Sequence, residues 1–361
     1  MELVNTALIL KDLPLPPEGK TGWPWTEQIE ILPDKMPDGS DWPRISIVTP
    51  NYNYGHFIEE TIRSVLLQGY PNLEYIVIDG GSTDNSVEII KKYEKWITYW
   101  VSEKDNGQTN AINKGYKHCT GKLFVWLNAD DAYINSTCLR NVSELYQRGY
   151  QLIVGECLNV DENDKPIKVT QKFNGCAPPQ NFDEYLRFWS FIPLPQPSVF
   201  ISKELTDNAF PLDETLYGTM DYQLFLRVLS QNPTSIWVRQ IWVKFKYHGK
   251  NKTMSSGKAD WYWEFLKISL SEAQKKYNFF KALKFTISAK DYLIIQSLFD
   301  TKLKLKFHSF LTLLLSRPSL ACWLIFWKIF AKSCFGNSRY LVFKQFVNNK
   351  AIFLKNVLPK I

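Results

Sequence analysis

From Arg44 onward, short runs of β-branched and aromatic residues alternate with amphipathic helical patterns, and this alternation limits the possible folds more than any other feature. The patterns predict strands at residues 45–49, 74–79, 97–102 and 123–127, separated by helices at 57–68, 84–95 and 108–118. Strands that alternate with helices in this way form an α/β fold, with a mostly parallel, twisted sheet flanked by helices. Ligands of such folds bind beyond the carboxyl ends of the strands. The residues that follow each strand are therefore the first candidates for a site.

After residue 151 the pattern becomes looser. Strands are predicted at 152–160 and 167–173, followed by a Pro-rich stretch at 193–197, a helix near 218–231 and a strand near 235–247. Residues 44–258 therefore make up the predicted α/β domain, and regions of different composition flank it.

Residues 1–43 form a Pro- and Trp-rich arm. Seven Pro prevent long helices in this segment. Trp23, Trp25 and Trp42 favour an arm that packs on the domain over a disordered leader, because large aromatic side chains are usually buried. The short apolar stretch at 3–10 follows Glu2 and does not match a signal peptide.

Charge is distributed unevenly along the chain. Residues 273–361 hold 16 Lys and Arg against 2 Asp and Glu, a net charge of +14, whereas the other 272 residues carry −7. The C-terminal region 259–361 is also aromatic and predicted to be helical. Such a region suits a helix lying at an anionic membrane surface, and the alternative is a helical cap with a solvated basic face. Its charge-free stretch 318–327 is too short to span a bilayer.

Other classes of protein find little support. RRM, KH and helix-turn-helix signals are absent, so nucleic acid is not an expected partner. The six Cys form no C-x-x-C pair and no Cys/His cluster, which favours free thiols in a reducing compartment. We expect a cytoplasmic protein that is peripheral on the inner face of the cytoplasmic membrane.

Acidic residues follow three of the predicted strands. Asp79 begins the run Asp-Gly-Gly-Ser-Thr-Asp, Asp105 follows the third strand, and the run Asn-Ala-Asp-Asp at 128–131 follows the fourth. A turn or a helix N-cap explains each run alone, but together they place carboxylates at one edge of the sheet. Such a cluster suits a divalent ion that also binds phosphate oxygens. The phosphate-binding loops G-x-x-x-x-G-K-[ST] and G-x-G-x-x-G are absent.

Four stretches resemble motifs of glycosyltransferase family 2, in order along the chain. They are residues 47–53 (IVTPNYN), 75–84 (YIVIDGGSTD), 111–115 (AINKG) and 126–131 (WLNADD), and the resemblance covers roughly residues 44–250. It implies the GT-A fold, with a nucleotide-binding α/β half and a looser acceptor-binding half. It also implies inverting transfer from a nucleotide-diphosphate-sugar, a UDP-sugar first among them, with Mn²⁺ or Mg²⁺ as cofactor.

The resemblance assigns residues to the donor nucleotide. Thr49, Pro50 and Tyr52 would line the nucleotide pocket. Asp79 would accept a hydrogen bond from the nucleobase, and Asp105 would lie near the nucleotide.

The resemblance also implies a metal site. Asn128 takes the first position of the family's D-x-D motif, so a contact to the ribose there would be a neutral one. Asp130 takes the last position and would bind the metal. His248 would lie near the metal or the pyrophosphate, and Asp131 would assist through an indirect contact.

Two residues are assigned to the acceptor side. The run at 220–227 (MDYQLFLR) resembles the family's E-D-x-D-L-x-x-R helix start, which puts Asp221 at the position of the catalytic base. Inverting transfer needs one such carboxylate beside the acceptor hydroxyl. Met220 and Gln223 replace two acidic residues of the pattern, so repulsion between charges would raise the pKa of Asp221 less. Gln196 resembles the family's acceptor-loop position.

The sequence thus predicts an enzyme, a glycosyltransferase that acts on a saccharide or lipid-linked saccharide in cell-surface polysaccharide synthesis. Two alternatives stay open. A nucleotidyltransferase on a related fold predicts a Gly-rich basic loop after the first strand, where residues 51–55 read Asn-Tyr-Asn-Tyr-Gly. A non-catalytic saccharide-binding or scaffold protein with a degenerate site is disfavoured by the presence of both Asp130 and Asp221.

Overall fold

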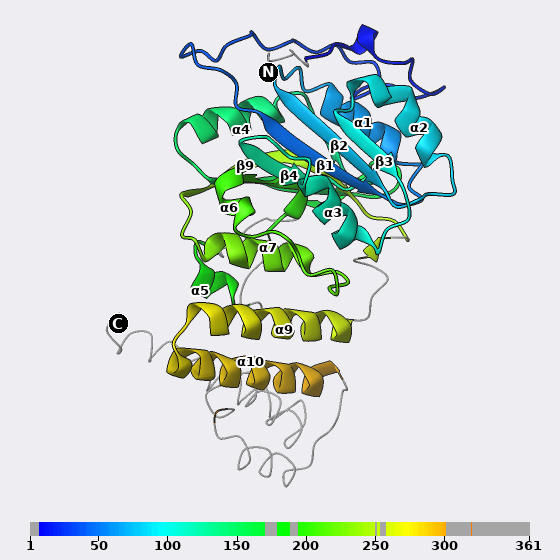
Figure 1. Ribbon diagram of the computed structural model, residues 1–361. Coiled ribbons are helices and arrows are strands. Elements are labelled where there is room, and N and C mark those ends of the chain that lie inside the picture. Colours follow the sequence, from blue (N-terminus) through cyan, green and yellow to red (C-terminus); the bar gives the residue numbers. More distant parts are fainter. Residues whose placement is uncertain are drawn as a thin grey trace, which may run out of the picture. The chain divides into compact units, whose positions relative to one another are not determined.

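The strands that begin after Arg44 lie side by side in one sheet (Figure 1). The computed structural model describes residues 7–169, 179–187, 194–249, 251–252, 258–300 and 319. Among these residues, nine strands form the sheet in the order β3-β2-β1-β4-β8-β6-β9-β5, with β7 paired to β6. Their bounds are β1 Ile45–Asn51, β2 Leu73–Asp79, β3 Tyr99–Ser102, β4 Leu123–Trp126, β5 Ala132–Tyr133, β6 Leu152–Val160, β7 Pro166–Val169, β8 Val199–Ser202 and β9 Ser235–Lys246.

The first half of the sheet is parallel. β1 pairs in parallel with β2 and β4, and β2 pairs in parallel with β3, so the carboxyl ends of these strands meet at one edge. The register places Asn51 beside Asp79, and Asp79 beside Ser102. The mostly parallel α/β fold predicted from the sequence is confirmed.

The second half of the sheet is mixed. β8 is antiparallel to both β4 and β6, whereas β6 and β9 pair in parallel. The sequence does not predict β8, because its four residues follow directly on the Pro-rich stretch. The strand predicted at 167–173 corresponds to β7, and its residues 170–173 lie outside the described residues.

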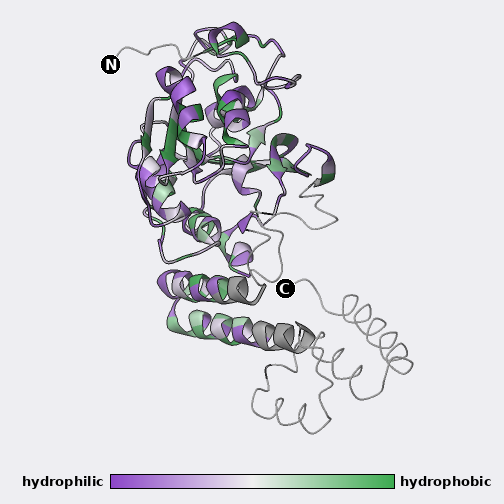
Figure 2. Ribbon diagram, turned by 90° about the vertical axis from the view of Figure 1, so that its right-hand side faces the viewer, coloured by the Kyte–Doolittle hydropathy of each residue, from purple (hydrophilic) through white to green (hydrophobic). Residues whose placement is uncertain are grey.

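Helices cover both faces of the sheet (Figure 1). Successive side chains of a strand point to opposite faces. Ile45 and Ile47 of β1 therefore join a buried cluster with α1, α2 and α4, whereas Val48 packs against Gly115 of α3. Hydrophobic residues accordingly dominate the strands (Figure 2). The helix bounds are α1 Ile58–Leu66, α2 Ser86–Tyr93, α3 Gln108–Tyr116, α4 Cys138–Gln147, α5 Phe182–Tyr185, α6 Lys203–Asp207, α7 Met220–Leu229, α9 Lys258–Lys276 and α10 Phe279–Asp300.

The arm that precedes β1 packs on the domain. Trp25 and Trp42 are buried, and the indole of Trp23 donates to the carbonyl oxygen of Tyr133 at 2.7 Å. The arm is therefore part of the folded unit and not a loose leader.

One side chain of α1, Arg63, holds two segments of this arm. Its buried guanidinium donates to the carbonyl oxygens of Pro14 at 2.8 Å, Pro24 at 3.1 Å and Trp25 at 3.1 Å. It also lies 5.4 Å from the centre of the Trp25 ring. A buried guanidinium is tolerated only when its donors are satisfied, so the arm and α1 stabilise one another.

The chain divides into two compact units, Met1–Phe265 and Leu266–Ile361. In the described part of the chain, no helix is both long enough and apolar enough to cross a membrane. Residues 301–361 lie outside the described residues except for residue 319, so the membrane-surface and helical-cap hypotheses for the basic region stay predictions. Cys119, Cys138 and Cys157 are buried free thiols, and the other three Cys lie outside the described residues.

Candidate active site

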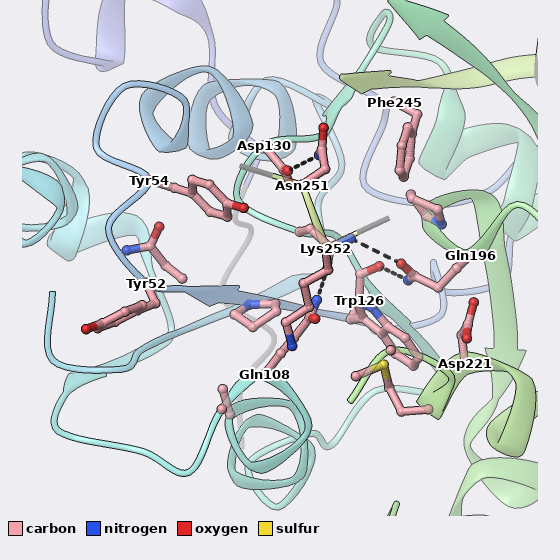
Figure 3. A pocket seen from close by; sticks show the side chains of 18 of the residues that line it. Tyr52, Tyr54, Gln108, Trp126, Asp130, Gln196, Asp221, Phe245, Asn251 and Lys252 are labelled. Carbon is pink, nitrogen blue, oxygen red and sulfur yellow. Dashed lines mark hydrogen bonds between the residues drawn. The ribbon is translucent and has the colours of Figure 1, made fainter. Parts of the chain in front are cut away.

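A pocket of about 1130 Å³ opens where the parallel strands end (Figure 3). Seven residues predicted from the sequence line it: Pro50, Tyr52, Asp105, Asn128, Asp130, Gln196 and Asp221. They come from five separate parts of the chain: the end of β1 with the loop after it, the loop after β3, the loop after β4, the short turn before β8, and the start of α7. Four other predicted residues, Thr49, Asp79, Asp131 and His248, do not line this pocket. They lie buried behind its wall.

Asp79 holds the loop after β2 in place through hydrogen bonds. Its Oδ1 accepts hydrogen bonds from Asn51 Nδ2 at 2.6 Å and Ser82 Oγ at 2.5 Å. Its Oδ2 accepts from the backbone N–H groups of Gly81 and Ser82 and from Ser102 Oγ, at 3.1, 2.9 and 2.6 Å. Two carboxylate oxygens offer about four lone-pair sites, and five donors already occupy them. Asp79 therefore organises the loop. Its carboxylate has no vacant lone pair for the nucleobase contact that the resemblance implies.

Thr49 also lies behind the pocket wall and does not line the pocket. It is fully buried within β1, and its Oγ1 accepts a hydrogen bond from Tyr75 at 3.1 Å.

Asp130 lies at the end of a short polar chain with His248 and Asn251. Its Oδ2 is 3.0 Å from His248 Nε2 and accepts a hydrogen bond of 3.0 Å from Asn251 Nδ2. The amide orientation of Asn251 is fixed, because its Oδ1 accepts from the His248 backbone N–H and its Nδ2 also donates to the Lys246 carbonyl at 3.1 Å. The imidazole of His248 stacks on Phe57 with ring centres 4.5 Å apart. The carboxylate of Asp130 is therefore held in one direction.

Asp131 has a different environment from its neighbour. Its side chain is 1% exposed, and burial, followed by the nearby charge of Asp130, raises the pKa of Asp131 well above the usual range. Its Oδ2 accepts a hydrogen bond from Asn128 Nδ2 at 3.1 Å. A buried carboxyl of this kind is favoured in its neutral form.

Asp221 begins α7 on the other side of the pocket (Figure 3). Its Oδ1 accepts the backbone N–H of Tyr222 at 2.7 Å. Burial raises the pKa of Asp221 to about 6. The sequence drew attention only to the loss of acidic neighbours, whereas removal of water from the carboxylate is what raises this pKa.

Aromatic side chains line the pocket together with this carboxylate. They include Trp126, Tyr185, Tyr222, Phe245 and Phe265. The rings of Tyr222 and Phe265 meet edge to face with centres 4.9 Å apart. This lining explains the desolvation of Asp221.

Comparison with known proteins identifies the domain that carries this site. Residues 46–209 match the sequence model of Glycosyl transferase family 2. The chain contains a glycosyl transferase family 2 domain. The loops after β1, β2, β3 and β4 and the turn with Gln196 lie within the matched residues, and Asp221 and His248 lie beyond them.

Relatives of the family 2 domain are found among bacterial proteins. The chain is 32% identical over 128 residues to an uncharacterized glycosyltransferase of Nostoc sp.. The aligned stretch covers 34% of this chain and 39% of that protein. It is 30% identical over 134 residues to the putative teichuronic acid biosynthesis glycosyltransferase TuaG of Bacillus subtilis, covering 34% of this chain and 53% of TuaG. The first matched relatives are covered over 32% to 66% of their own length.

Solved structures confirm the GT-A fold of the family 2 domain. The crystal structure of S. aureus TarS residues 1–349 in complex with UDP-GlcNAc has a TM-score of 0.55 and 16% sequence identity. The match covers 69% of this chain and 72% of that one.

A chain of neutral amides links side chains that line the pocket. Gln108 Nε2 donates to Asn128 Oδ1 at 2.8 Å, Asn128 Nδ2 lies 3.4 Å from Gln196 Oε1, and Gln196 Nε2 donates to the carbonyl of Trp126 at 2.7 Å. Gln196 is thereby tied to the D-x-D segment, a link that its position in the sequence does not reveal.

Lys252 is a pocket residue that the sequence does not predict (Figure 3). Its Nζ donates to the carbonyl of Tyr217 at 3.2 Å and lies 4.9 Å from the centre of the Tyr217 ring. Burial lowers the pKa of Lys252, against the opposing charges of Asp105 and Glu264. No motif marks one Lys among many, and only the neighbouring predicted residue His248 could have drawn attention to it.

Proposed function

We propose that this chain transfers a glycosyl group from a nucleoside-diphosphate sugar to a hydroxyl of a saccharide or lipid-linked saccharide, with inversion at the anomeric carbon. The observation that carries the proposal is one pocket lined by both Asp130 and Asp221. A held carboxylate with an adjacent imidazole suits the diphosphate end of a donor. A desolvated carboxylate with a raised pKa suits general-base catalysis.

A UDP-sugar is the donor we favour. The TarS structure that shares this fold contains UDP-GlcNAc. The relation to TuaG, whose name refers to teichuronic acid biosynthesis, supports a role in cell-surface polysaccharide synthesis. Pro50 and Tyr52 would contact the nucleoside, and Asn128 would contact the ribose, since all three line the pocket.

Asp130 and His248 fit a divalent metal. Ligands of an octahedral ion at 2.0–2.1 Å lie about 2.9 Å apart when they are adjacent, and Asp130 Oδ2 and His248 Nε2 are 3.0 Å apart. Within the described residues no group of three or more His, Cys, Asp or Glu side chains gathers around one point. Mn²⁺ or Mg²⁺ would therefore take its remaining ligands from water and phosphate oxygens, as Mg²⁺ sites commonly do. When bound, the ion would neutralise charge on the leaving diphosphate.

The residues of the chain perform the transfer as follows. Asp221 accepts the proton of the acceptor hydroxyl as its oxygen attacks the anomeric carbon. The bond from that carbon to the diphosphate oxygen breaks on the opposite face, which inverts the configuration and releases the nucleoside diphosphate. Lys252 places a positive charge at the pocket wall, where it would interact with the diphosphate.

Location at the inner face of the cytoplasmic membrane is part of the proposal. The net charge of +14 in residues 273–361 supports it, because each basic residue near anionic lipid contributes about 1 kcal/mol. Sedimentation with anionic vesicles at low salt is the expected result, and an unbound protein under these conditions would contradict it.

The test of the transferase is release of nucleoside diphosphate from a panel of donor sugars, with Mn²⁺ or Mg²⁺ and with chelator. We expect metal-dependent release from one nucleotide class, and loss of release in Asp130→Ala and Asp221→Asn. A protein that binds donor and never cleaves it, with or without an acceptor panel, would instead be the saccharide-binding alternative. Release of pyrophosphate from a nucleoside triphosphate and a sugar phosphate would identify the nucleotidyltransferase.

A further inference from the structure

Two glycines at the end of β2 let a neighbouring loop approach the pocket closely. A Cβ atom on Gly80 would lie 2.6 Å from Asp105 Oδ2, and one on Gly81 would lie 3.2 Å from the backbone N of Lys104. Gly81 also has a φ of +80°, a conformation that L side chains rarely adopt. The space that a side chain at position 80 would fill is therefore taken by the carboxylate of Asp105, which comes from the next loop along the sheet edge.

Asp105 and Asp79 differ in what their oxygens contact. Asp79 is fully buried and its oxygens accept five hydrogen bonds. Asp105 lines the pocket, and its Oδ1 accepts the backbone N–H of Gly107 at 2.8 Å. Within the described part of the chain, Asp105 Oδ2 accepts no hydrogen bond. The Gly107 contact fixes the rotamer of Asp105 and leaves Oδ2 directed at the surface above Gly80.

We propose that Asp105, and not Asp79, reads the nucleobase of the donor, by accepting a ring N–H that lies next to a carbonyl group. This inference rests on the proposed function and refines its substrate class. An ionised carboxylate only accepts hydrogen bonds, so it favours the N3–H of uracil or the N1–H of guanine. The N3 of cytosine and the N1 of adenine are acceptors, and a carboxylate there would face an unpaired lone pair. Tyr52, whose side chain is largely exposed, lines the same pocket and offers an aromatic face to a base.

The experiment is calorimetric binding of UDP, GDP, CDP and ADP to the full chain in the presence of Mn²⁺, without any turnover. The wild type should bind UDP or GDP at least tenfold more tightly than CDP and ADP, because a hydrogen bond to a charged group is involved. The UDP and GDP arms distinguish a pyrimidine from a purine site.

Asp105→Asn should weaken the preferred nucleotide about 10- to 100-fold. It should also strengthen CDP relative to UDP, since an amide can donate to N3 of cytosine. Gly80→Ala keeps the carboxylate but forces it to move, and should reduce the same preference in part. Glu103→Gln is the matched control, because Glu103 is an exposed acid of the same loop that pairs with Lys114 at 2.7 Å and does not line the pocket. It should leave all four affinities unchanged.

The outcomes separate the inference from the function on which it rests. If the wild type prefers one base and Asp105→Asn keeps the ratio of the affinities within twofold, the assignment of Asp105 is wrong and the transferase proposal stands. If the wild type binds none of the four nucleotides, the proposed function itself fails and this inference fails with it. Melting temperatures of the variants close to that of the wild type show that they are folded, which is expected for the partly exposed Asp105.

Discussion

Two aspartates near the pocket, Asp79 behind its wall and Asp221 on its wall, have opposite environments. On the proposed donor side, Asp79 lies at the end of β2 among hydroxyl, amide and backbone donors, with five hydrogen bonds to its two oxygens. On the proposed acceptor side, Asp221 Oδ1 accepts the backbone N–H of Tyr222 at 2.7 Å. Aromatic side chains line the same pocket. Asp79 is the last residue of β2, and Asp221 lies in the first turn of α7.

The difference lies in how each charge is compensated. A carboxylate with several donors is fixed in position and holds a loop, whereas a carboxylate in an apolar wall has a raised pKa and is available to accept a proton. The proposed donor side thus has a carboxylate that fixes a loop, and the proposed acceptor side has a carboxylate that is suited to accept a proton.

Asp221→Asn should have the largest effect on transfer and almost none on donor binding. Loss of a general base lowers turnover by about 10²- to 10⁴-fold, while the affinity for nucleoside diphosphate should stay within about twofold. Steady-state kinetics and calorimetry on the same preparation measure both. A variant that turns over at the wild-type rate would remove Asp221 from the role of base and erase the contrast between the two sides.

Asp130 and Asp131 should respond differently to the same substitution. Asp130→Asn removes the proposed metal ligand and should weaken Mn²⁺-dependent nucleotide binding by about 10- to 100-fold. Asp131→Asn replaces a buried carboxyl that is favoured in its neutral form by an amide of the same shape, so binding should change by less than about threefold. Equal losses in both variants would mean that the pair acts as one ionised unit.

The pH dependence of kcat/KM tests the environment of Asp221 directly. The base must be ionised to accept a proton, and its pKa is raised to about 6. The rate should therefore rise with pH through about 6 and fall about tenfold for each pH unit below it. An acidic limb of the kcat/KM profile centred near pH 4 would instead indicate that the Asp221 carboxylate is solvated. Asp221→Asn, measured at whatever residual rate remains, should lack the limb.

Stability should change in opposite directions on the two sides. Ser82→Ala removes a hydroxyl that donates to Asp79 and accepts the Asn53 N–H at 2.7 Å, and should lower the free energy of unfolding by about 1–3 kcal/mol. Asp221→Asn should raise the free energy of unfolding by about 1 kcal/mol above pH 6 and leave it unchanged below pH 4. The pKa of Asp221 is higher in the folded than in the unfolded state, so its ionisation destabilises the folded protein only when the pH exceeds the pKa of the unfolded state. Urea denaturation at pH 4 and pH 8 measures both variants. Stabilisation by Ser82→Ala would contradict the structural role of the Asp79 loop.

The sequence predicts the parallel half of the fold and much of the pocket. Strands β1, β2 and β4 and helix α3 follow the predicted ranges closely, because each has a continuous local pattern. Asp105, Asp130 and Asp221, which the sequence singles out, line one pocket. The antiparallel β8 is missing from the prediction, since four residues after a Pro-rich turn carry no periodic signal and gain strand structure only by pairing with β4 and β6.

What the chain alone determined was the order of its motifs, because strand and turn preferences are encoded in neighbouring residues. The tertiary structure decided which side chain of each motif faces the pocket. Asp79 is directed into its own loop, Asp105 fills the space over Gly80, and Asn251 holds Asp130 from a segment 121 residues away. These roles depend on the hydrogen-bond donors and the amount of water around each carboxylate. That environment arises only when distant segments of the chain pack together.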